Sequence, residues 1–263
     1  MSQDVTLAEV AKSFPRNGAT APVLTDISFT VDPGEFVAIL GPSGSGKSTI
    51  LRLIAGLDQP TSGQVAVGGR EVSVTDDRCA VVFQEPRLLP WRSVGGNVAL
   101  GARRRKGKQT ARINQLLEEV GLAHVADAWP HQLSGGMAQR VGLARGLAAE
   151  PDVLLLDEPF AALDALTRLR MQELLLQLWR HHAQTVVLVT HDIDETLYLA
   201  DRIIILGESP ARIVATHSVT LPRPRDRSHP TIGRLRDEIL HRFGVGVTVE
   251  RQDTDCNNAL AAD

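Results

Sequence analysis

The sequence predicts an α/β protein built on a mostly parallel sheet. Short, unbroken apolar runs recur along the chain, separated by stretches with helical periodicity; the runs are FVAIL (36–40), VLLL (153–156), VVLV (186–189) and IIIL (203–206). Runs of this kind are typical of parallel strands whose two faces are both covered. A glycine-rich segment follows the first run and two acidic residues follow the second, so polar residues gather where predicted strands end.

Two further patterns add to this sheet. Ile27, Phe29 and Val31 alternate with polar residues, and a second alternation near Val65 indicates an additional antiparallel patch. Between residues 86 and 150, apolar residues follow helical spacing and no buried strand is evident, which predicts an inserted helical subdomain.

The domain organisation follows from these patterns. We expect one domain over residues 1–220, with the helical subdomain at about 86–150 inserted in it. Residues 221–263 begin with a linker rich in proline and arginine, continue with helical spacing from Ile232 to Phe243, and end in a polar stretch. These residues predict a C-terminal linker, a short helix and a frayed tail.

Composition narrows the class of protein only slightly. Of the 263 residues, 43% are hydrophobic and 22% are charged, and the formal net charge of −3 selects no charged partner. Cys79 and Cys256 suggest neither a disulfide framework nor a cysteine-rich metal site. Because no signal sequence is evident and no apolar run approaches the ~20 residues that span a bilayer, we expect a cytosolic chain.

The glycine-rich segment GPSGSGKST is a candidate phosphate-binding loop. It consists of Gly41, Pro42, Ser43, Gly44, Ser45, Gly46, Lys47, Ser48 and Thr49. In such a loop, backbone N–H groups converge on phosphate oxygens at a helix N-terminus, and the lysine reaches the outer phosphates. The alternative, a glycine turn without function, is disfavoured by the strand before it and the helix after it. The sequence therefore predicts triphosphate binding.

Polar residues at the ends of other predicted strands complete a candidate catalytic set. Ser48 and Asp157 offer oxygen ligands to Mg²⁺, and Glu158 is placed to polarise the attacking water as a general base. Gln84 follows another apolar strand, where its amide could touch both Mg²⁺ and water. His191 follows a third and could hydrogen-bond a terminal phosphate oxygen. The alternatives are acids that cap a helix and a histidine with a structural role.

The order Lys47, Gln84, LSGGM, Asp157-Glu158 and His191 resembles the ATP-binding cassette (ABC) ATPases over about residues 14–206. The resemblance implies a P-loop NTPase fold with a mostly parallel core sheet, an antiparallel β subdomain and an inserted helical subdomain. It assigns further contacts to seven residues: Phe14 to adenine, Asp164 to the dimer interface, and Leu133, Ser134, Gly135, Gly136 and Met137 to a signature loop facing the ATP of the other subunit.

Three stretches resemble the nitrate, taurine and sulfonate import group, and most of all its aliphatic sulfonate importers; they are VVFQEPRLLPWRSVGGNVALG, EPFAALDALTRLRMQELLLQLW and LPRPRDRS. This resemblance implies an ATPase that uses ATP and Mg²⁺ and pairs with a second copy of itself. It also implies two transmembrane permease subunits, an external solute-binding protein reached through them, and a peripheral location at the cytoplasmic face of the inner membrane. Nucleic acid is not an implied partner.

Other functions remain open at this point. The same motor could serve taurine or nitrate. A non-transport cassette ATPase acting on DNA or ribosomes is a second alternative, disfavoured because the chain has one phosphate loop and no extended heptads. A GTP-driven switch would require a guanine-reading NKxD motif, which the sequence lacks.

Several positions depart from the family pattern or invite a second interpretation. Ala161 stands where glycine or serine is usual, and Gly142 and Gly146 replace alanines in a helix. Each of these glycines costs about 1 kcal/mol of helix stability relative to alanine. The segment PRLLPW at 86–91 is a candidate docking surface for a permease helix, or simply part of the core. The basic run RRRKGK at 103–108 is interpreted as a solvated loop.

Overall fold

The structure, a computed structural model, describes residues 2–16, 19–102 and 109–245. The chain divides into two compact units, Met1–Arg225 and Asp226–Asp263. The second unit contains α7 (Pro230–Arg242), which begins with a proline at a position where the missing N–H group is not needed. The basic run at 103–108 and Cys256 lie outside the described residues. In the part of the chain that is described, no helix combines the length and apolar character needed to cross a membrane.

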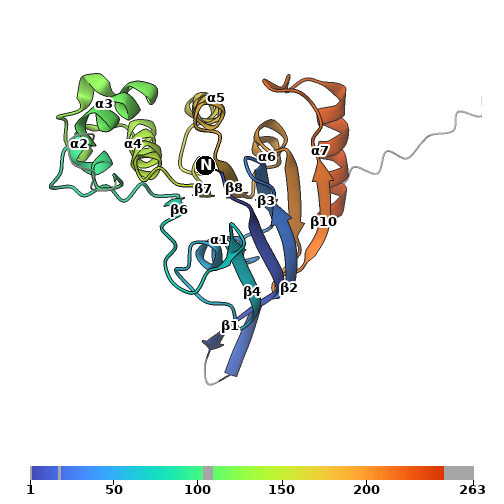
Figure 1. Cartoon of the computed structure of the whole chain (residues 1–263). Coiled ribbons are helices and arrows are strands. Elements are labelled where there is room, and N and C mark those ends of the chain that lie inside the picture. The colour runs from blue at the N-terminus through green and yellow to red at the C-terminus, as the bar shows by residue number, and fades with distance from the viewer. Residues whose placement is uncertain (1, 17–18, 103–108, 246–263) are drawn as a thin grey trace, which may run out of the picture. The chain divides into compact units, whose positions relative to one another are not determined.

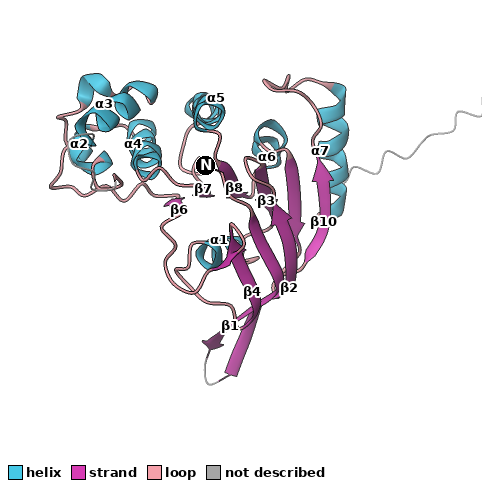
Figure 2. Ribbon diagram, in the orientation of Figure 1, coloured by secondary structure: helices cyan, strands magenta, loops and turns pink. Residues whose placement is uncertain are grey.

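A six-stranded sheet forms the centre of the first unit, as Figure 2 shows. Its strands are β3 (Phe36–Leu40), β6 (Cys79–Val82), β7 (Val153–Asp157), β8 (Thr185–Thr190), β9 (Arg202–Leu206) and β10 (Ile213–Ser218). The spatial order is β10-β9-β3-β8-β7-β6, and every neighbouring pair is parallel except β9 and β10. The four unbroken apolar runs are the buried strands, which confirms the predicted parallel core.

A second, antiparallel sheet of four strands has the order β2-β1-β4-β5. Its strands are β1 (Val5–Arg16), β2 (Ala19–Val31), β4 (Ser62–Val67) and β5 (Arg70–Glu71). The predicted antiparallel patch is therefore confirmed. The sequence did not reveal β1, because register shifts between Leu7 and Val10 break the alternation of its apolar residues.

The main core lies between the two sheets, around α1 (Lys47–Ile54). Figure 1 shows α1 on one side of the six-stranded sheet and α5 (Ala165–His182) and α6 (Ile193–Leu199) on the other. Val37 and Ile39 of β3 belong to the core on the α1 side. On the opposite side, the ring of Phe36 meets Trp179 of α5 edge to face, with 5.9 Å between centroids.

The described residues between β6 and β7 contain helices and no strand, which confirms the predicted helical insertion. The α-helices are α2 (Val94–Val98), α3 (Gln109–Glu119) and α4 (Gly135–Ala148), with single 3-10 turns at Ala123–Val125 and Pro130–Gln132. Asn97 of α2 is fully buried, and its amide bonds both the N–H and the carbonyl of Leu89. These hydrogen bonds therefore fix the backbone of the segment after β6 at Leu89.

Two arginines fix the end of the first unit. Arg225 is buried and donates hydrogen bonds to the carbonyls of Leu197, Ala200 and Val219, among others. Burial lowers the pKa of Arg225 to about 10. Arg223 forms an ion pair with Asp201. Because these side chains anchor the backbone up to residue 225, the stretch after Val219 belongs to the compact first unit.

Candidate nucleotide-binding site

The candidate site lies along one edge of the six-stranded sheet. The parallel strands β3, β8, β7 and β6 are consecutive neighbours, so their carboxyl ends share this edge. Residues 41–49 follow β3, and His191 follows β8. Asp157 is the last residue of β7 and Glu158 comes directly after it, while Gln84 lies two residues beyond β6. The topology therefore places the residues of four predicted motifs at one sheet edge, where ligands bind in open α/β sheets.

The loop at 41–49 needs glycine at particular positions. Gly44 and Gly46 have φ angles of 80° and 84°, in the left-handed region that side chains other than glycine rarely adopt. A Cβ atom at Gly46 would lie only 2.7 Å from Leu24 Cδ2 of β2. The loop then enters α1 at Lys47, where the first N–H groups of the helix have no partner within it. A helix start of this kind is suited to binding an anion such as a phosphate.

Lys47 closes over the loop that precedes it. Its ammonium group donates to the carbonyls of Gly41 at 2.8 Å and Pro42 at 2.9 Å. Burial lowers the pKa of Lys47, while the carboxylates of Glu158 and Asp157 oppose that shift. The Ser45 hydroxyl is also buried in this loop and has no hydrogen-bond partner in the structure. A buried cation and an unpartnered hydroxyl suit a ligand that brings oxygen acceptors, such as a phosphate.

Ser48 and Asp157 form a pair of oxygen donors beside the loop. The Ser48 hydroxyl donates to Asp157 Oδ1 at 2.7 Å. Adjacent ligands of an octahedral Mg²⁺ ion lie about 2.9 Å apart, since Mg–O distances are about 2.0–2.1 Å. Burial raises the pKa of Asp157, and the hydrogen bond from Ser48 opposes this shift. A nearby dication would favour the ionised carboxylate, so the pair fits the chemistry of a magnesium site.

Glu158 lies between two candidate site residues. Its Oε2 atom is 3.1 Å from His191 Nδ1, and its Oε1 atom is 3.7 Å from Lys47 Nζ. The backbone N–H of Glu158 donates to Val189 O of β8, and its φ angle of 45° is unusual for a residue other than glycine. The structure thus fixes both the backbone and the carboxylate of Glu158 at the end of β7.

The side chains of Gln84 and Phe14 form no hydrogen bond or ion pair with the other candidate site residues in the part of the chain that is described. Gln84 is exposed at the sheet edge beyond β6, the strand next to β7. Phe14 lies on β1 and is half-buried, with Lys12 Nζ 4.8 Å from its ring centroid. Their assigned contacts with water, Mg²⁺ and adenine stay predictions.

The signature loop belongs to a different part of the first unit. Ser134 is the N-cap of α4 and accepts a hydrogen bond from Met137 N at 3.3 Å, while Ser134 and Gly135 are exposed. Figure 1 shows α4 grouped with α2 and α3, away from α1. The structure brings the signature loop close to the start of α5 instead: a Cβ atom at Gly136 would lie 2.6 Å from Thr167 Cγ2. Asp164, also exposed, caps α5 by accepting from Thr167 N.

A polar network behind His191 was not identified from the sequence. Thr190 donates to Glu195 Oε2 at 2.7 Å, and Glu195 is only 3% exposed. Arg168 of α5 bonds Asp192 Oδ2 and the carbonyl of Leu163. The signal was present in the sequence: Asp192 and Glu195 have the spacing of a capping box at the start of α6.

The fold and the arrangement of this site are those of one class of protein, the P-loop nucleoside triphosphatases. The ABC transporter family profile matches residues 24–161. The aliphatic sulfonates import ATP-binding protein SsuB of Granulibacter bethesdensis is 52% identical over 241 residues, 92% of this chain and 94% of its own length. The SsuB 1 protein of Pseudomonas fluorescens is 51% identical over 235 residues, 89% of this chain and 86% of its own.

A solved structure agrees with these sequence matches. The dimeric ATP-binding cassette MJ0796, in a post-hydrolysis state bound to ADP and Pi, is 33% identical, with a TM-score of 0.72. The comparison covers 83% of this chain and 100% of that one. The chain belongs to the ABC transporter family and is an ATPase of that family. The predicted family resemblance and fold class are thereby confirmed.

Proposed function

We propose that the chain is the energy-coupling subunit of an ABC importer for aliphatic sulfonates, in which ATP binding closes a dimer and hydrolysis opens it again. One observation carries the catalytic part of the proposal. Ser48 and Asp157 form one contact at the sheet edge, and Glu158 lies beside both Lys47 and His191. The proposed phosphate loop, the proposed metal ligands, the proposed base and the His191 imidazole therefore lie together at this edge of the sheet.

Each residue has a role suited to its contacts. The N–H groups of residues 44–49 and the Lys47 ammonium bind the phosphates, and Ser48 and Asp157 hold Mg²⁺. When bound, Mg²⁺ supplies positive charge to the phosphate oxygens. Glu158 accepts a proton from the attacking water, His191 orients Glu158 and bonds a terminal phosphate oxygen, and Gln84 completes the metal and water contacts. Phe14 stacks on adenine.

The second half of each site comes from another copy of the chain. Ser134 and Gly135 are exposed at the N-terminus of α4, which carries partial positive charge, so this loop is available to an anion outside its own chain. Asp164 is exposed at the neighbouring start of α5. The dimeric state of MJ0796 supports an assembly in which the residues at 133–137 reach the partner's ATP.

A Glu158→Gln substitution tests the catalytic assignment. The amide keeps the size of the side chain but cannot act as a base, so ATP should still bind while turnover falls by about 100-fold or more. Because ATP is then not consumed, light scattering should show an ATP-dependent dimer. Near-normal hydrolysis, or a monomer at saturating ATP, would contradict the proposal. Lys47→Ala is the control, since it should abolish ATP binding itself.

The substrate is proposed from the relatives, whose names specify import of aliphatic sulfonates. A deletion strain should lose growth on an alkanesulfonate as the sole sulfur source and regain it with this chain. Growth on taurine as sulfur source and on nitrate as nitrogen source separates the alternatives. Loss confined to taurine or nitrate would replace the sulfonate assignment while leaving the ATPase proposal intact.

The permease partner is proposed to dock on the segment at 86–91. Trp91 is 68% exposed, so it is not part of the core, whereas Leu88 and Leu89 are half-buried. Hydrogen bonds with the side chains of Asn97 and Arg145 fix the backbone of this segment. Two permease subunits docked here would place the chain at the cytoplasmic face of the membrane and link it to an external solute-binding protein. Trp91→Ala should weaken binding to permease-containing vesicles. Unchanged binding would show that this segment is not the docking surface.

A further inference from the structure

Three potential metal ligands meet where two helices end, and none of them belongs to the set of candidate nucleotide-site residues. Glu119 is the last residue of α3, and His181 and His182 form the end of α5. One ligand atom from each of the three residues lies within 4.8 Å of the others. The cluster joins the helical insertion to a helix that covers the six-stranded sheet.

The spacing of the ligand atoms is that of a small coordination site. Glu119 Oε2 is 2.8 Å from His182 Nε2, and Glu119 Oε1 is 3.6 Å from His181 Nε2. Zinc bound at about 2.0–2.1 Å in a tetrahedron separates its ligand atoms by about 3.3 Å. The two distances, one to each oxygen of the Glu119 carboxylate, lie on either side of this value, and one ligand atom of each residue lies within 4.8 Å of the others. Small side-chain rotations would therefore bring the three ligand atoms to tetrahedral spacing.

The chemistry of the three donors selects the kind of ion. Two imidazoles and one carboxylate suit Zn²⁺ and neighbouring transition metals, whereas Mg²⁺ and Ca²⁺ prefer oxygen ligands alone. The side chain of His181 is 62% exposed, so the outer face of the cluster is open to water as a fourth ligand.

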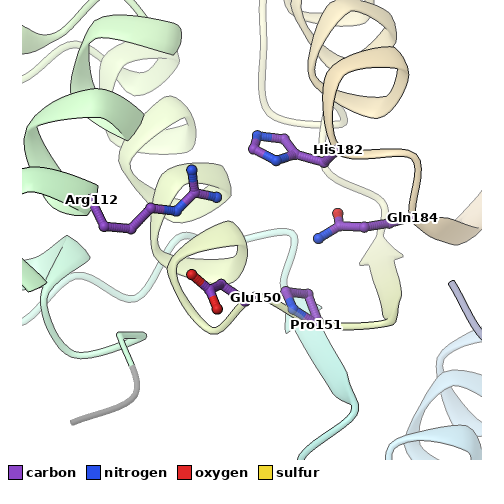
Figure 3. Close-up of a pocket in the computed structure, with 5 residues that line it drawn as sticks. All are labelled: Arg112, Glu150, Pro151, His182 and Gln184. Carbon is purple, nitrogen blue, oxygen red and sulfur yellow. The ribbon is translucent and has the colours of Figure 1, made fainter. Parts of the chain in front are cut away.

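The surroundings contain charges of both signs. A pocket of about 290 Å³ adjoins the cluster and is lined by Arg112, Glu150, Pro151, His182 and Gln184. Figure 3 shows Arg112 of α3 and His182 pointing into this pocket from opposite sides, with Glu150 below them. Arg112 opposes a cation, while Glu150 and the partial negative charge at the ends of α3 and α5 favour one.

We propose that Glu119, His181 and His182 form a binding site for a transition-metal dication of the zinc type, which fastens the end of α3 to the end of α5. The simpler arrangement, a hydrogen bond between Glu119 and His182, accounts for the 2.8 Å contact. It does not account for the second histidine, whose Nε2 atom also faces the same carboxylate.

The test uses the full chain without a histidine tag, stripped of metal and kept free of nucleotide in excess Mg²⁺. Titration with Zn²⁺ in a calorimeter should show one saturable ion per chain, and zinc should raise the melting temperature. His181→Ala retains the contact between Glu119 and His182, so it should fold normally. It should nevertheless weaken zinc binding by about 10-fold or more, since it removes one ligand of three.

A matched control keeps the interpretation specific. His124 is an exposed histidine on a 3-10 turn of the same helical insertion, and His124→Ala should bind zinc as the unaltered chain does. No saturable binding to the unaltered chain would overturn the proposal. Equal affinity of the chains with and without His181 would also overturn it, because the zinc would then lie elsewhere.

Discussion

At the residue scale, the candidate base is positioned by contacts within its own chain. Glu158 reaches His191 at 3.1 Å and Lys47 at 3.7 Å, and its backbone has a positive φ angle of 45°. A strained backbone of this kind costs about 1–3 kcal/mol and persists only where neighbouring structure holds it. The backbone bond to Val189 provides that restraint. The Glu158 carboxylate is therefore preorganised.

Glu195 is the second residue whose environment is unusual. It lies beneath the turn that carries His191, receives the Thr190 hydroxyl, and has Arg168 Nε 3.9 Å from its Oε1 atom. Asp192 and His191 also act on it electrostatically. Burial is the largest influence and raises the pKa of Glu195 to about 7. Near neutral pH, this buried side chain can therefore exist with or without its proton.

This raised pKa predicts how stability depends on pH. Between the ordinary pKa near 4.5 and the folded value near 7, the folded chain holds a proton that the unfolded chain has released. The contribution of Glu195 to stability is therefore complete below pH 4.5 and is lost as the pH rises to about 7. The total loss is about 3 kcal/mol.

Glu195→Gln should remove that loss, because the neutral amide resembles the protonated acid and can still accept from Thr190. Urea unfolding of both chains at pH 5 and pH 8 measures the effect. The substituted chain should gain about 2–3 kcal/mol relative to the original on going from pH 5 to pH 8. Stability curves that run parallel across this range would contradict the assignment. Glu173→Gln, an exposed site on α5, is the control.

At the element scale, the two glycines inside α4 have different surroundings. A Cβ atom at Gly142 would lie 3.4 Å from Pro86 Cβ, an ordinary contact. At Gly146 it would lie 2.9 Å from Val82 Cγ2 of β6, and valine has few ways to move aside. The sequence predicts only the helix-propensity penalty of both glycines. The structure shows that Gly146 permits the close approach of α4 to β6.

The two positions should therefore respond oppositely to alanine. Gly142→Ala should stabilise the chain by about 0.5–1 kcal/mol, because it recovers helix propensity without a clash. Gly146→Ala should destabilise it by about 1 kcal/mol or more, since overpacking outweighs the same gain. Denaturant unfolding of both variants checks this, and Val82→Ala should relieve part of the cost at Gly146. Equal effects at the two positions would show that packing against β6 is unimportant.

The elements also show what a single sequence can predict. Buried parallel strands and amphipathic helices were predictable, because each carries its own apolar pattern. The strand β1 could not be predicted, because its bulges interrupt the apolar pattern. The strand β10 could not be predicted either, because its residues are half-buried or exposed and form no unbroken apolar run. The ion pairs of Glu158 and the burial of Glu195 depend on residues more than thirty positions away or on the packing of neighbouring elements. Contacts of this kind cannot be predicted from local sequence patterns.

At the scale of the whole molecule, the two candidate phosphate-binding loops lie in different parts of the first unit. The loop at 41–49 opens α1 beneath the six-stranded sheet, and Ser134 opens α4 in the helical insertion. Among the described residues, no hydrogen bond joins the two loops. Under the proposed function, each chain would contribute one half of each of two sites, and a head-to-tail pair of chains would complete both of them.

Mixing two defective chains tests this arrangement. Lys47→Ala removes the phosphate contact of its own loop, and Ser134→Arg blocks the exposed loop, so each variant alone should fail to hydrolyse ATP. A mixed dimer would contain one site with Lys47 from one chain and Ser134 from the other. A 1:1 mixture should therefore recover about a quarter of the original turnover, because about half of the dimers are mixed and each has one complete site. If both loops served the same chain's nucleotide, no mixture could assemble a complete site and activity would stay at background. The decisive control is a mixture with a chain carrying both substitutions, which should recover nothing.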